Sequence, residues 1–304
     1  MTRMFTTAAT VEDALEALGS GARPIAGGTD LMVGARQGKA PLPEAIVAID
    51  RIAALEGIVE GDDRLRLGAL VTHEEIVAND VIRARFTALA DASAIVGSHA
   101  TRAQGTIGGN VMNASPAMDT GGPLLCFGAS ADLRSASGER SLPLEQLWIG
   151  PGETAADPRE LLVRVDVPAP APATGSAYVR LEYRRQMEIA VVGVTAVVRL
   201  DAGSVSDARV AITALAPTIR RVSEAEAALI GSDGGDEAID EAARAAASGS
   251  SPITDVRSSA EYRSAMANVI ARRAIVVALA RARAEHVPIP ASAATYASVG
   301  GTST

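Results

Sequence analysis

Two glycine-rich loops are the segments of this sequence whose residue types suggest chemistry. The first, Ala26–Asp30 (AGGTD), lies between an expected strand and an expected helix, and the second is Gly105–Asn110 (GTIGGN). Glycines permit positive φ and let backbone N–H groups converge on an anion, and a following helix N-terminus adds its dipole. Two such loops about 80 residues apart could clamp the two phosphates of a dinucleotide. Two tight turns in a glycine-rich chain would give the same pattern.

The rest of the sequence offers little for acid–base or metal chemistry. It contains no strand-linked GxGxxG, Walker loop, CxxC, HExxH or GxSxG motif. His73, His99 and His286 share no metal-ligand spacing, and acids such as Glu74 and Glu75 fit solvated helix faces. The sequence therefore predicts neither a catalytic residue nor a metal site on this chain.

Composition limits the class of protein. The chain has 304 residues, enough for two domains, and its 48% apolar and 21% charged residues are typical of a soluble globular protein. A net charge of −8 without a basic stripe argues against nucleic acid as a partner. The single cysteine, Cys126, can neither form an internal disulfide nor ligate an iron–sulfur cluster. Because no signal peptide or membrane span is evident, a cytoplasmic protein is predicted.

Periodicity and capping residues predict the elements that position the loops. Thr10, with Asp13 in the first turn, predicts a helix that ends at Gly19 or Gly21, and Thr72–Glu75 predicts a capping box. The segment 97–122 is typical of chain that wraps a ligand. The other elements predicted up to residue 167 are strands at 23–26 and 45–49, a helix at 30–37, a hairpin of 55–60 with 64–70, a helix at 81–96, a strand pair around 137–139 and a strand at 161–167.

A second domain is predicted after the proline-rich segment Pro168–Gly175, which is typical of a stiff, extended linker. Three strands followed by helices indicate an α+β pattern. The strands are expected at 177–185, 189–200 and 205–215, and the helices after a Ser223/Glu226 capping box, at 236–247 and at 260–285. The last of these helices is amphipathic through Tyr262, Met266, Val269, Ile270 and Val277, and the tail after His286 is expected to be loose.

The two loops and several later motifs resemble the FAD-binding subunits of molybdenum hydroxylases, the xanthine dehydrogenase family. Pro24–Leu31 (PIAGGTDL) resembles the first FAD loop of that family, and Arg102–Asn110 (RAQGTIGGN) resembles the second. The resemblance extends from Phe5 to about Ala284. Its further motifs are at 113–119, 150–154, 160–162, 178–190, 252–263 and 272–274.

This resemblance implies an α+β fold in two domains. Residues 1–170 would form a two-lobed FAD-binding domain of the vanillyl-alcohol-oxidase (PCMH) type, with lobes of about 1–55 and 56–170. Residues 176–286 would form a small C-terminal domain like that of CO dehydrogenase flavoproteins, with a three-stranded sheet and helices. Residues 287–304 would form a flexible tail.

The resemblance also implies the cofactor-binding residues. The backbone of 26–31 would hold the FAD pyrophosphate, Asp119 would bond the adenosine ribose, and Ile189 would lie beside the isoalloxazine ring. Ser115 would lie near the phosphates, and Val96, Leu162 and Arg180 would contact the cofactor. The complete implied set is Pro24, Ile25, Ala26, Gly27, Gly28, Thr29, Asp30, Leu31, Val96, Thr106, Gly108, Gly109, Asn110, Ser115, Asp119, Leu162, Arg180 and Ile189.

The sequence departs from the family pattern at a few of these places. Arg102–Gly105 replaces a common Arg-Asn-Arg-Gly, Arg180 replaces a common lysine and Glu188 replaces a common aspartate. Ile189 stands where an aromatic residue often neighbours the flavin. These departures concern local contacts, and the family assignment does not depend on them.

The function implied is electron transfer within a complex. A large subunit would carry a molybdopterin cofactor and hydroxylate the substrate, and a small subunit with two 2Fe-2S clusters would pass electrons to FAD on this chain. The flavin would then reduce an external acceptor, and the complex would be a dimer of heterotrimers. Flavin chemistry needs binding and orientation from the protein, which agrees with the lack of a catalytic constellation.

Two alternatives remain at this point. A stand-alone FAD-dependent oxidase of the same fold would need a polar substrate pocket with a catalytic Tyr, His or Arg, and none of the four tyrosines has such a setting. A flavin-free binding module is disfavoured by the intact glycine loops. Copurifying partner chains would exclude the first alternative, and absence of flavin would favour the second.

Overall fold

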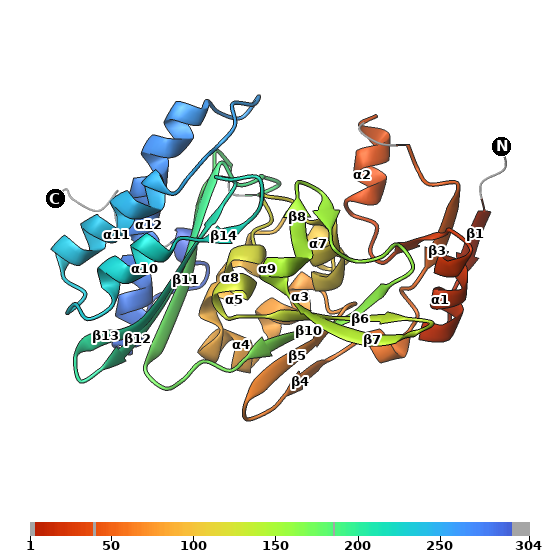
Figure 1. Cartoon of the computed structure of the whole chain (residues 1–304), viewed down its shortest axis with the longest axis horizontal. Coiled ribbons are helices and arrows are strands. Elements are labelled where there is room, and N and C mark those ends of the chain that lie inside the picture. The colour runs from red at the N-terminus through yellow and green to blue at the C-terminus, as the bar shows by residue number, and fades with distance from the viewer. Residues whose placement is uncertain (1–3, 39–40, 185, 294–304) are drawn as a thin grey trace.

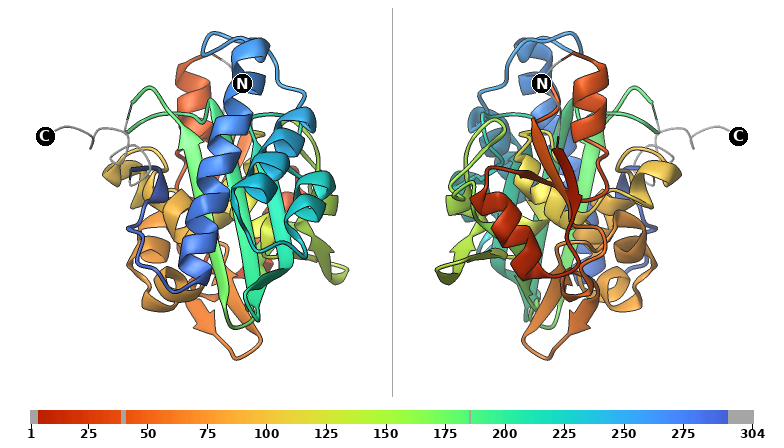
Figure 2. Two further views of the ribbon diagram at one scale, coloured as in Figure 1. Left: turned by 90° about the vertical axis from the view of Figure 1, so that its left-hand side faces the viewer. Right: turned by 90° about the vertical axis from the view of Figure 1, so that its right-hand side faces the viewer.

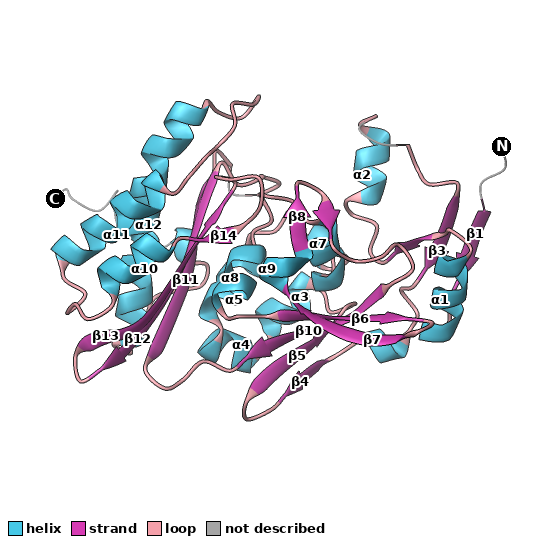
Figure 3. Cartoon of the chain, in the orientation of Figure 1, coloured by secondary structure: helices cyan, strands magenta, loops and turns pink. Residues whose placement is uncertain are grey.

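The computed structural model describes residues 4–38, 41–184 and 186–293. Arg185, the last residue of the strand predicted at 177–185, lies outside the described residues. So do residues 294–304, which make up most of the predicted tail. Figure 1 shows three blocks side by side, which we name the N-terminal lobe (4–55), the central lobe (56–168) and the C-terminal domain (174–293). Figure 3 shows that the strands form separate sheets in the three blocks. The predicted α+β fold is confirmed.

The N-terminal lobe is a small three-stranded parallel sheet with one helix packed on it. The strand order is β1-β3-β2, and Thr10 and Asp13 form the predicted capping box of α1. The apolar face of α1, with Val11, Leu15 and Leu18, packs in the lobe's core. The elements are β1 (Met4–Thr7), α1 (Val11–Gly19), β2 (Arg23–Ile25), α2 (Leu31–Arg36), β3 (Ala45–Ala48) and a 3-10 turn η1 (Ala53–Leu55). The first glycine loop connects β2 to α2.

The central lobe is a five-stranded antiparallel sheet covered on one face by short helices. Alternate residues such as Leu65, Leu67 and Val165 bury one face, as expected of a sheet with one solvated side. The strands, in the order β4-β5-β10-β6-β7, are β4 (Ile58–Glu60), β5 (Arg64–Gly68), β10 (Leu161–Pro168), β6 (Ser130–Ser135) and β7 (Gly138–Pro143), and a hairpin of β8 (Trp148–Gly150) and β9 (Glu153–Thr154) stands apart. The helices are α3 (His73–Ala78), α4 (Asp80–Arg85), α5 (Thr87–Ala94), α6 (His99–Arg102), α7 (Ile107–Asn113), α8 (Gly121–Cys126) and α9 (Leu144–Leu147).

The single helix predicted at 81–96 is wrong, because it is broken at Phe86. The backbone of Phe86, at φ −118° and ψ 46°, leaves the helical region. Its buried ring packs edge-on against Phe127 with ring centroids 5.2 Å apart. The break places the aromatic side chain in the core. It could not be predicted from helical periodicity, because periodicity depends on neighbouring residues and Phe127 is distant in the sequence.

The C-terminal domain is a four-stranded antiparallel sheet with three helices on one face. In the left view of Figure 2 these helices lie in front of the sheet. The strands, in order, are β11 (Thr174–Leu181), β12 (Val192–Asp201), β13 (Ser204–Thr213) and β14 (Arg220–Arg221), and the helices are α10 (Ser223–Leu229), α11 (Asp236–Ser248) and α12 (Ala260–Ala282). The expected three-stranded sheet therefore has a fourth strand, which at two residues is too short to produce a sequence pattern.

Two expectations about these helices are wrong in detail. Glu226 forms no capping box with Ser223, because its carboxylate binds Arg221 through two 2.7 Å contacts and accepts the Val210 N–H at 3.0 Å. In α12 the predicted apolar residues Tyr262 and Val269 are 43% and 36% exposed. The buried face carries four alanines beside larger apolar residues, and a side chain at Gly175 would come 2.1 Å from the Ala278 carbonyl oxygen. Small residues thus let β11 pack close to α12.

The second face of the C-terminal sheet packs on the central lobe. Tyr178, Val197 and Ala211 belong to the hydrophobic core of the central lobe, whereas Ala177 and Val179 face α12. The helices of the central lobe, α5 and α8 above all, lie between the two sheets (Figure 3). β11 is therefore buried on both faces, as its burial from Gly175 to Leu181 shows.

The expected flexible tail differs from the structure over its described part, 287–293. Ala291 and Ser292 are buried, Val287 packs against the core of the C-terminal domain, and Ile289 packs against that of the central lobe. The proline-rich linker is shorter than predicted, because Pro168 ends β10 and Thr174 begins β11.

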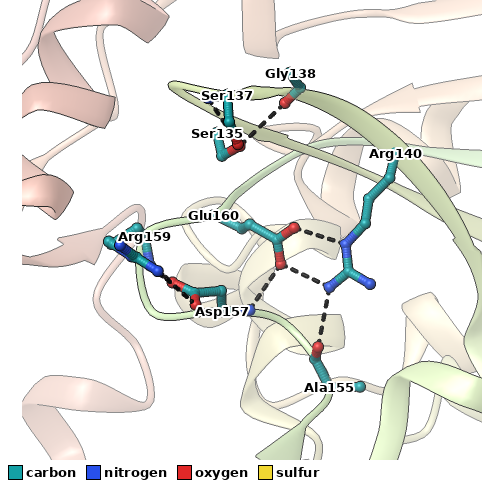
Figure 4. Close-up of polar contacts among 8 residues, drawn as sticks. All are labelled: Ser135, Ser137, Gly138, Arg140, Ala155, Asp157, Arg159 and Glu160. Carbon is teal, nitrogen blue, oxygen red and sulfur yellow. Dashed lines mark hydrogen bonds and ion pairs between the residues drawn. The ribbon is translucent and has the colours of Figure 1, made fainter.

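The loop that joins β9 to β10 is held by Glu160 (Figure 4). Its carboxylate accepts from Arg140 Nε at 2.6 Å and Nη2 at 2.8 Å, and from the Asp157 N–H at 2.7 Å. Arg140 Nη2 also donates to the Ala155 carbonyl at 3.0 Å. This two-point contact, joined to the backbone on both sides, positions the start of β10.

Glu160→Gln is expected to lower the free energy of unfolding by about 1–2 kcal/mol, because it removes one charge of a bidentate pair. Arg140 lowers the pKa of Glu160 from its ordinary 4.5, so the contribution is present above that pH and is lost as pH falls through the lowered value. Urea unfolding measures the change. Arg159→Ala, which removes an exposed pair with Asp157, is the control and should change nothing measurable. Equal losses in both variants would contradict the assignment.

Candidate cofactor-binding site

The two glycine loops pack directly against each other. A Cβ added at Gly27 would lie 1.7 Å from the Gln104 carbonyl oxygen. A Cβ added at Gly105 would lie 3.4 Å from both the Thr29 hydroxyl and a ring carbon of His73. Gly27 is therefore required because the backbone of the second loop occupies the space of a side chain.

The first loop presents unused backbone donors. The N–H groups of 27–30 donate to no backbone or side-chain acceptor among the described residues. The carbonyls of Gly28 and Asp30 accept from Met32 and Gly34 and so continue into α2. Gly28 has a φ of +68°, which strains any residue with a side chain. Successive unpaired N–H groups in a turn form a concave site that suits an anion.

The second loop is bonded within the protein. The N–H groups of Gly105, Ile107 and Gly108 donate to carbonyls of Thr101, Val71 and Ala69 at 2.6, 2.8 and 3.0 Å. The Gly109 N–H donates to the Thr106 hydroxyl, which caps α7. This loop therefore braces the first loop. Among its members Gly109 is exposed and Asn110 half-buried.

His73 lies beneath this junction as a buried, neutral side chain. It is 1% exposed, its backbone N–H donates to the Gly105 carbonyl at 3.1 Å, and its Nδ1 has no partner in the described part of the chain. Burial, assisted by the positive charge of Arg102, lowers the pKa of His73 from 6.5 to about 4. The imidazole is uncharged at neutral pH.

His73 predicts a pH-dependent stability. Below pH 6.5 the unfolded chain binds a proton at this residue and the folded protein does not, so the free energy of unfolding falls by roughly 3 kcal/mol between pH 6.5 and pH 4. Below pH 4 this contribution stops changing. Urea unfolding of wild type and His73→Gln across this range measures it: the difference between the two curves should follow the titration. A constant difference would contradict the buried neutral state.

A buried ion pair lies at the boundary between the central lobe and the C-terminal domain. Arg180 is fully buried and donates from Nη1 to Asp119 at 2.7 Å and from Nε to Glu182 at 2.6 Å. Tyr178 donates its hydroxyl to the other Asp119 oxygen at 2.7 Å. Burial alone would lower the pKa of Arg180, but the surrounding acids hold it above its ordinary value, so the guanidinium stays charged.

Tyr178 and Glu182 were not identified from the sequence as site residues. A usable signal was present, because Tyr178 and Arg180 are two residues apart in β11 and so share a face, and Glu182 follows directly after this strand. Two polar residues on one face of a buried strand require partners across the interface. The identity of that partner, Asp119, depends on the tertiary fold.

The segment after β11 lies beside the end of α5. The Met187 N–H donates to the Gly97 carbonyl at 2.9 Å, which brings Val96 close to this segment. Arg180 Nη1 donates to the Glu188 carbonyl at 3.3 Å, and the neighbouring Ile189 is 44% exposed. The structure thus gathers Val96, Asp119, Arg180 and Ile189 in one region.

The other predicted residues have different surroundings. Leu162 is 3% exposed within the core of the central lobe, and Ser115 is half-buried with its hydroxyl bonded to the Ala117 N–H. Pro24 and Ile25 end β2 and lead into the first loop. Within the described ranges no group of three or more His, Cys, Asp or Glu side chains is arranged to hold a metal ion. None of the described helices, α12 included, has the length and apolar character needed to cross a membrane.

These residues fit a dinucleotide. The first loop offers unpaired amides for a pyrophosphate, and the second loop fixes the shape of the first. Each Asp119 oxygen already accepts one hydrogen bond, but a carboxylate oxygen can accept a second from a ribose hydroxyl.

Comparison with known proteins assigns the family. The family model "FAD binding domain in molybdopterin dehydrogenase" matches residues 2–170, and "CO dehydrogenase flavoprotein C-terminal domain" matches 177–278. The carbon monoxide dehydrogenase medium chain of Hydrogenophaga pseudoflava is 33% identical over 87% of this chain and 91% of that protein. The 6-hydroxypseudooxynicotine dehydrogenase complex subunit alpha of Paenarthrobacter nicotinovorans is 33% identical over 92% and 95%. A solved structure of the Hydrogenophaga enzyme superposes with a TM-score of 0.88 at 32% identity, covering 92% of this chain and 98% of that chain. This chain therefore belongs to the FAD-binding subunits of the molybdenum hydroxylase family, as its loop motifs predicted.

Proposed function

We propose that this chain transfers electrons within a molybdenum hydroxylase, from iron–sulfur clusters of a partner subunit to an external acceptor. The observation that carries the proposal is the first glycine loop, whose four adjacent backbone N–H groups, 27–30, are unpaired within the described residues and are braced by the second loop. Bound FAD would supply the redox chemistry, and the protein would supply binding and orientation.

The residues divide the binding task. The backbone of 26–31 would hold the pyrophosphate, with Thr106, Gly108, Gly109 and Asn110 opposite it and Ser115 nearby. Asp119 would bond the ribose while Arg180 fixes its carboxylate. Exposed Ile189 would border the flavin ring, with Val96 adjacent. Leu162, which is buried in the core of the central lobe, would contact the cofactor from that side.

Partner subunits would hold the remaining redox groups. The single cysteine, Cys126, is buried, and burial raises the pKa of its thiol far above the ordinary value, so it is unsuited to ligating a cluster. Relatives described as a medium chain and as a complex subunit support a large molybdopterin subunit and a small iron–sulfur subunit. A cytoplasmic dimer of heterotrimers is the assembly we propose.

Native purification tests this function. The preparation should show a flavin absorption spectrum with iron–sulfur bands, contain molybdenum, and resolve into this chain and two others. A flavin that is reduced by an organic substrate on the isolated chain would instead indicate a stand-alone oxidase. A preparation without flavin would refute both.

A further inference from the structure

The chain after α12 runs back across the junction between the two domains. This segment, Val287–Ala293, which we name the strap, lies beyond residue 278, where the match to the family's C-terminal domain ends. In the left view of Figure 2 the dark-blue end of the chain turns back from the lower end of α12 and runs beside the orange helices of the central lobe. Val287 packs on one domain's core and Ile289 on the other's.

A buried carboxylate anchors the strap. Asp91, on α5, is fully buried and accepts from the Ala291 N–H at 2.9 Å and the Tyr178 N–H at 3.2 Å. It also accepts from Arg281 at 2.6 and 3.0 Å, and Arg281 donates to the carbonyls of Val287 and Pro288. One side chain of the central lobe thus holds the strap, β11 and the end of α12.

One residue after Ala291, the strap contacts the backbone of Arg180. β11 is the edge strand of its sheet, so every second backbone N–H faces away from β12 and needs another acceptor. Asp91 accepts the one at Tyr178, and the buried hydroxyl of Ser292 accepts the one at Arg180 at 3.0 Å. The side chain of Arg180 then reaches Asp119.

We propose that Ser292 is a positioning residue for FAD binding: it holds the backbone of Arg180 so that the guanidinium fixes Asp119 toward the cofactor. This inference rests on the proposed function for the role of Asp119 and Arg180. When the hydroxyl is removed, the Arg180 N–H is left buried without that acceptor, so β11 shifts to reach another. The shift moves the guanidinium, which makes two short charged contacts and tolerates little displacement.

Ser292→Ala tests the proposal in the full-length protein. Apoprotein titrated with FAD, followed by flavin fluorescence, should show a Kd about fivefold higher than wild type, which corresponds to loss of one buried hydrogen bond. Hydrogen exchange of the Arg180 amide should become faster. Truncation after Glu285, which removes the strap, should weaken FAD binding at least as much.

Thr87→Val is the matched control for a merely structural role. The Thr87 hydroxyl donates to the Ser176 carbonyl on the same edge strand at 2.6 Å, across the same domain boundary. This variant should lower the Tm and leave the FAD Kd unchanged. Unchanged FAD affinity in Ser292→Ala, with wild type binding normally, would overturn the positioning role alone. Failure of wild type to bind FAD would overturn the proposed function, and the positioning role would fall with it.

Discussion

Gly27→Ala is expected to raise the Kd for FAD about 100-fold, so that the purified protein loses its flavin. The added methyl group would lie 1.7 Å from the Gln104 carbonyl oxygen, well inside contact distance, and this obstacle is backbone that cannot rotate away. The two loops must separate, and the unpaired amides of 27–30 then lose their common direction. Flavin content per chain and a fluorescence titration measure the effect.

The control for this variant lies seven residues away. A Cβ at Gly34, inside α2, would meet nothing within 4 Å. Gly34→Ala should therefore retain FAD, and alanine should favour the helix by up to about 1 kcal/mol. If Gly27→Ala kept its flavin, the packing of the two loops could not be what shapes the site.

Asp91→Ala is expected to destabilise the protein by about 3–5 kcal/mol, because it leaves the charge of Arg281, whose side chain is 6% exposed, buried without its carboxylate. It also removes the acceptor of the Tyr178 and Ala291 N–H groups. Thermal and urea unfolding measure the loss. Asp91→Asn should fall between wild type and alanine, since it keeps the shape and one acceptor but removes the charge.

A double-mutant cycle tests the cause of that loss. If the unpaired charge is responsible, Asp91→Ala/Arg281→Ala should be much less destabilised than the sum of the two single variants. Additive losses would show that the packing of α12, rather than the ion pair, dominates. Arg159→Ala, which removes only an exposed pair, should change nothing measurable.

Much of the local structure could be predicted from the sequence, because it depends on residues within a few positions of each other. The capping boxes at Thr10 and Thr72 and the loop between β2 and α2 are of this kind. The family could also be predicted from the sequence, because motifs of that family occur in the same order along most of the chain. Predictions failed where a residue outside the local segment determines the structure. The predicted helix is broken at Phe86, whose ring packs against Phe127. Glu226 forms no capping box, because its carboxylate binds Arg221 and the Val210 N–H instead.

The sequence by itself determined the α+β fold, the two glycine loops and the family of the chain. Only the tertiary structure decided that the two loops have different roles. The backbone amides of the first loop are unpaired among the described residues, whereas most of those of the second donate to carbonyls of the protein and hold that loop against the first. It also decided that Arg281 meets Asp91 across 190 positions, and that Ser292 meets Arg180 across 112. Such pairs have no periodicity or spacing to reveal them. They form because buried polar groups must find partners, and only the packed chain determines which partners are within reach.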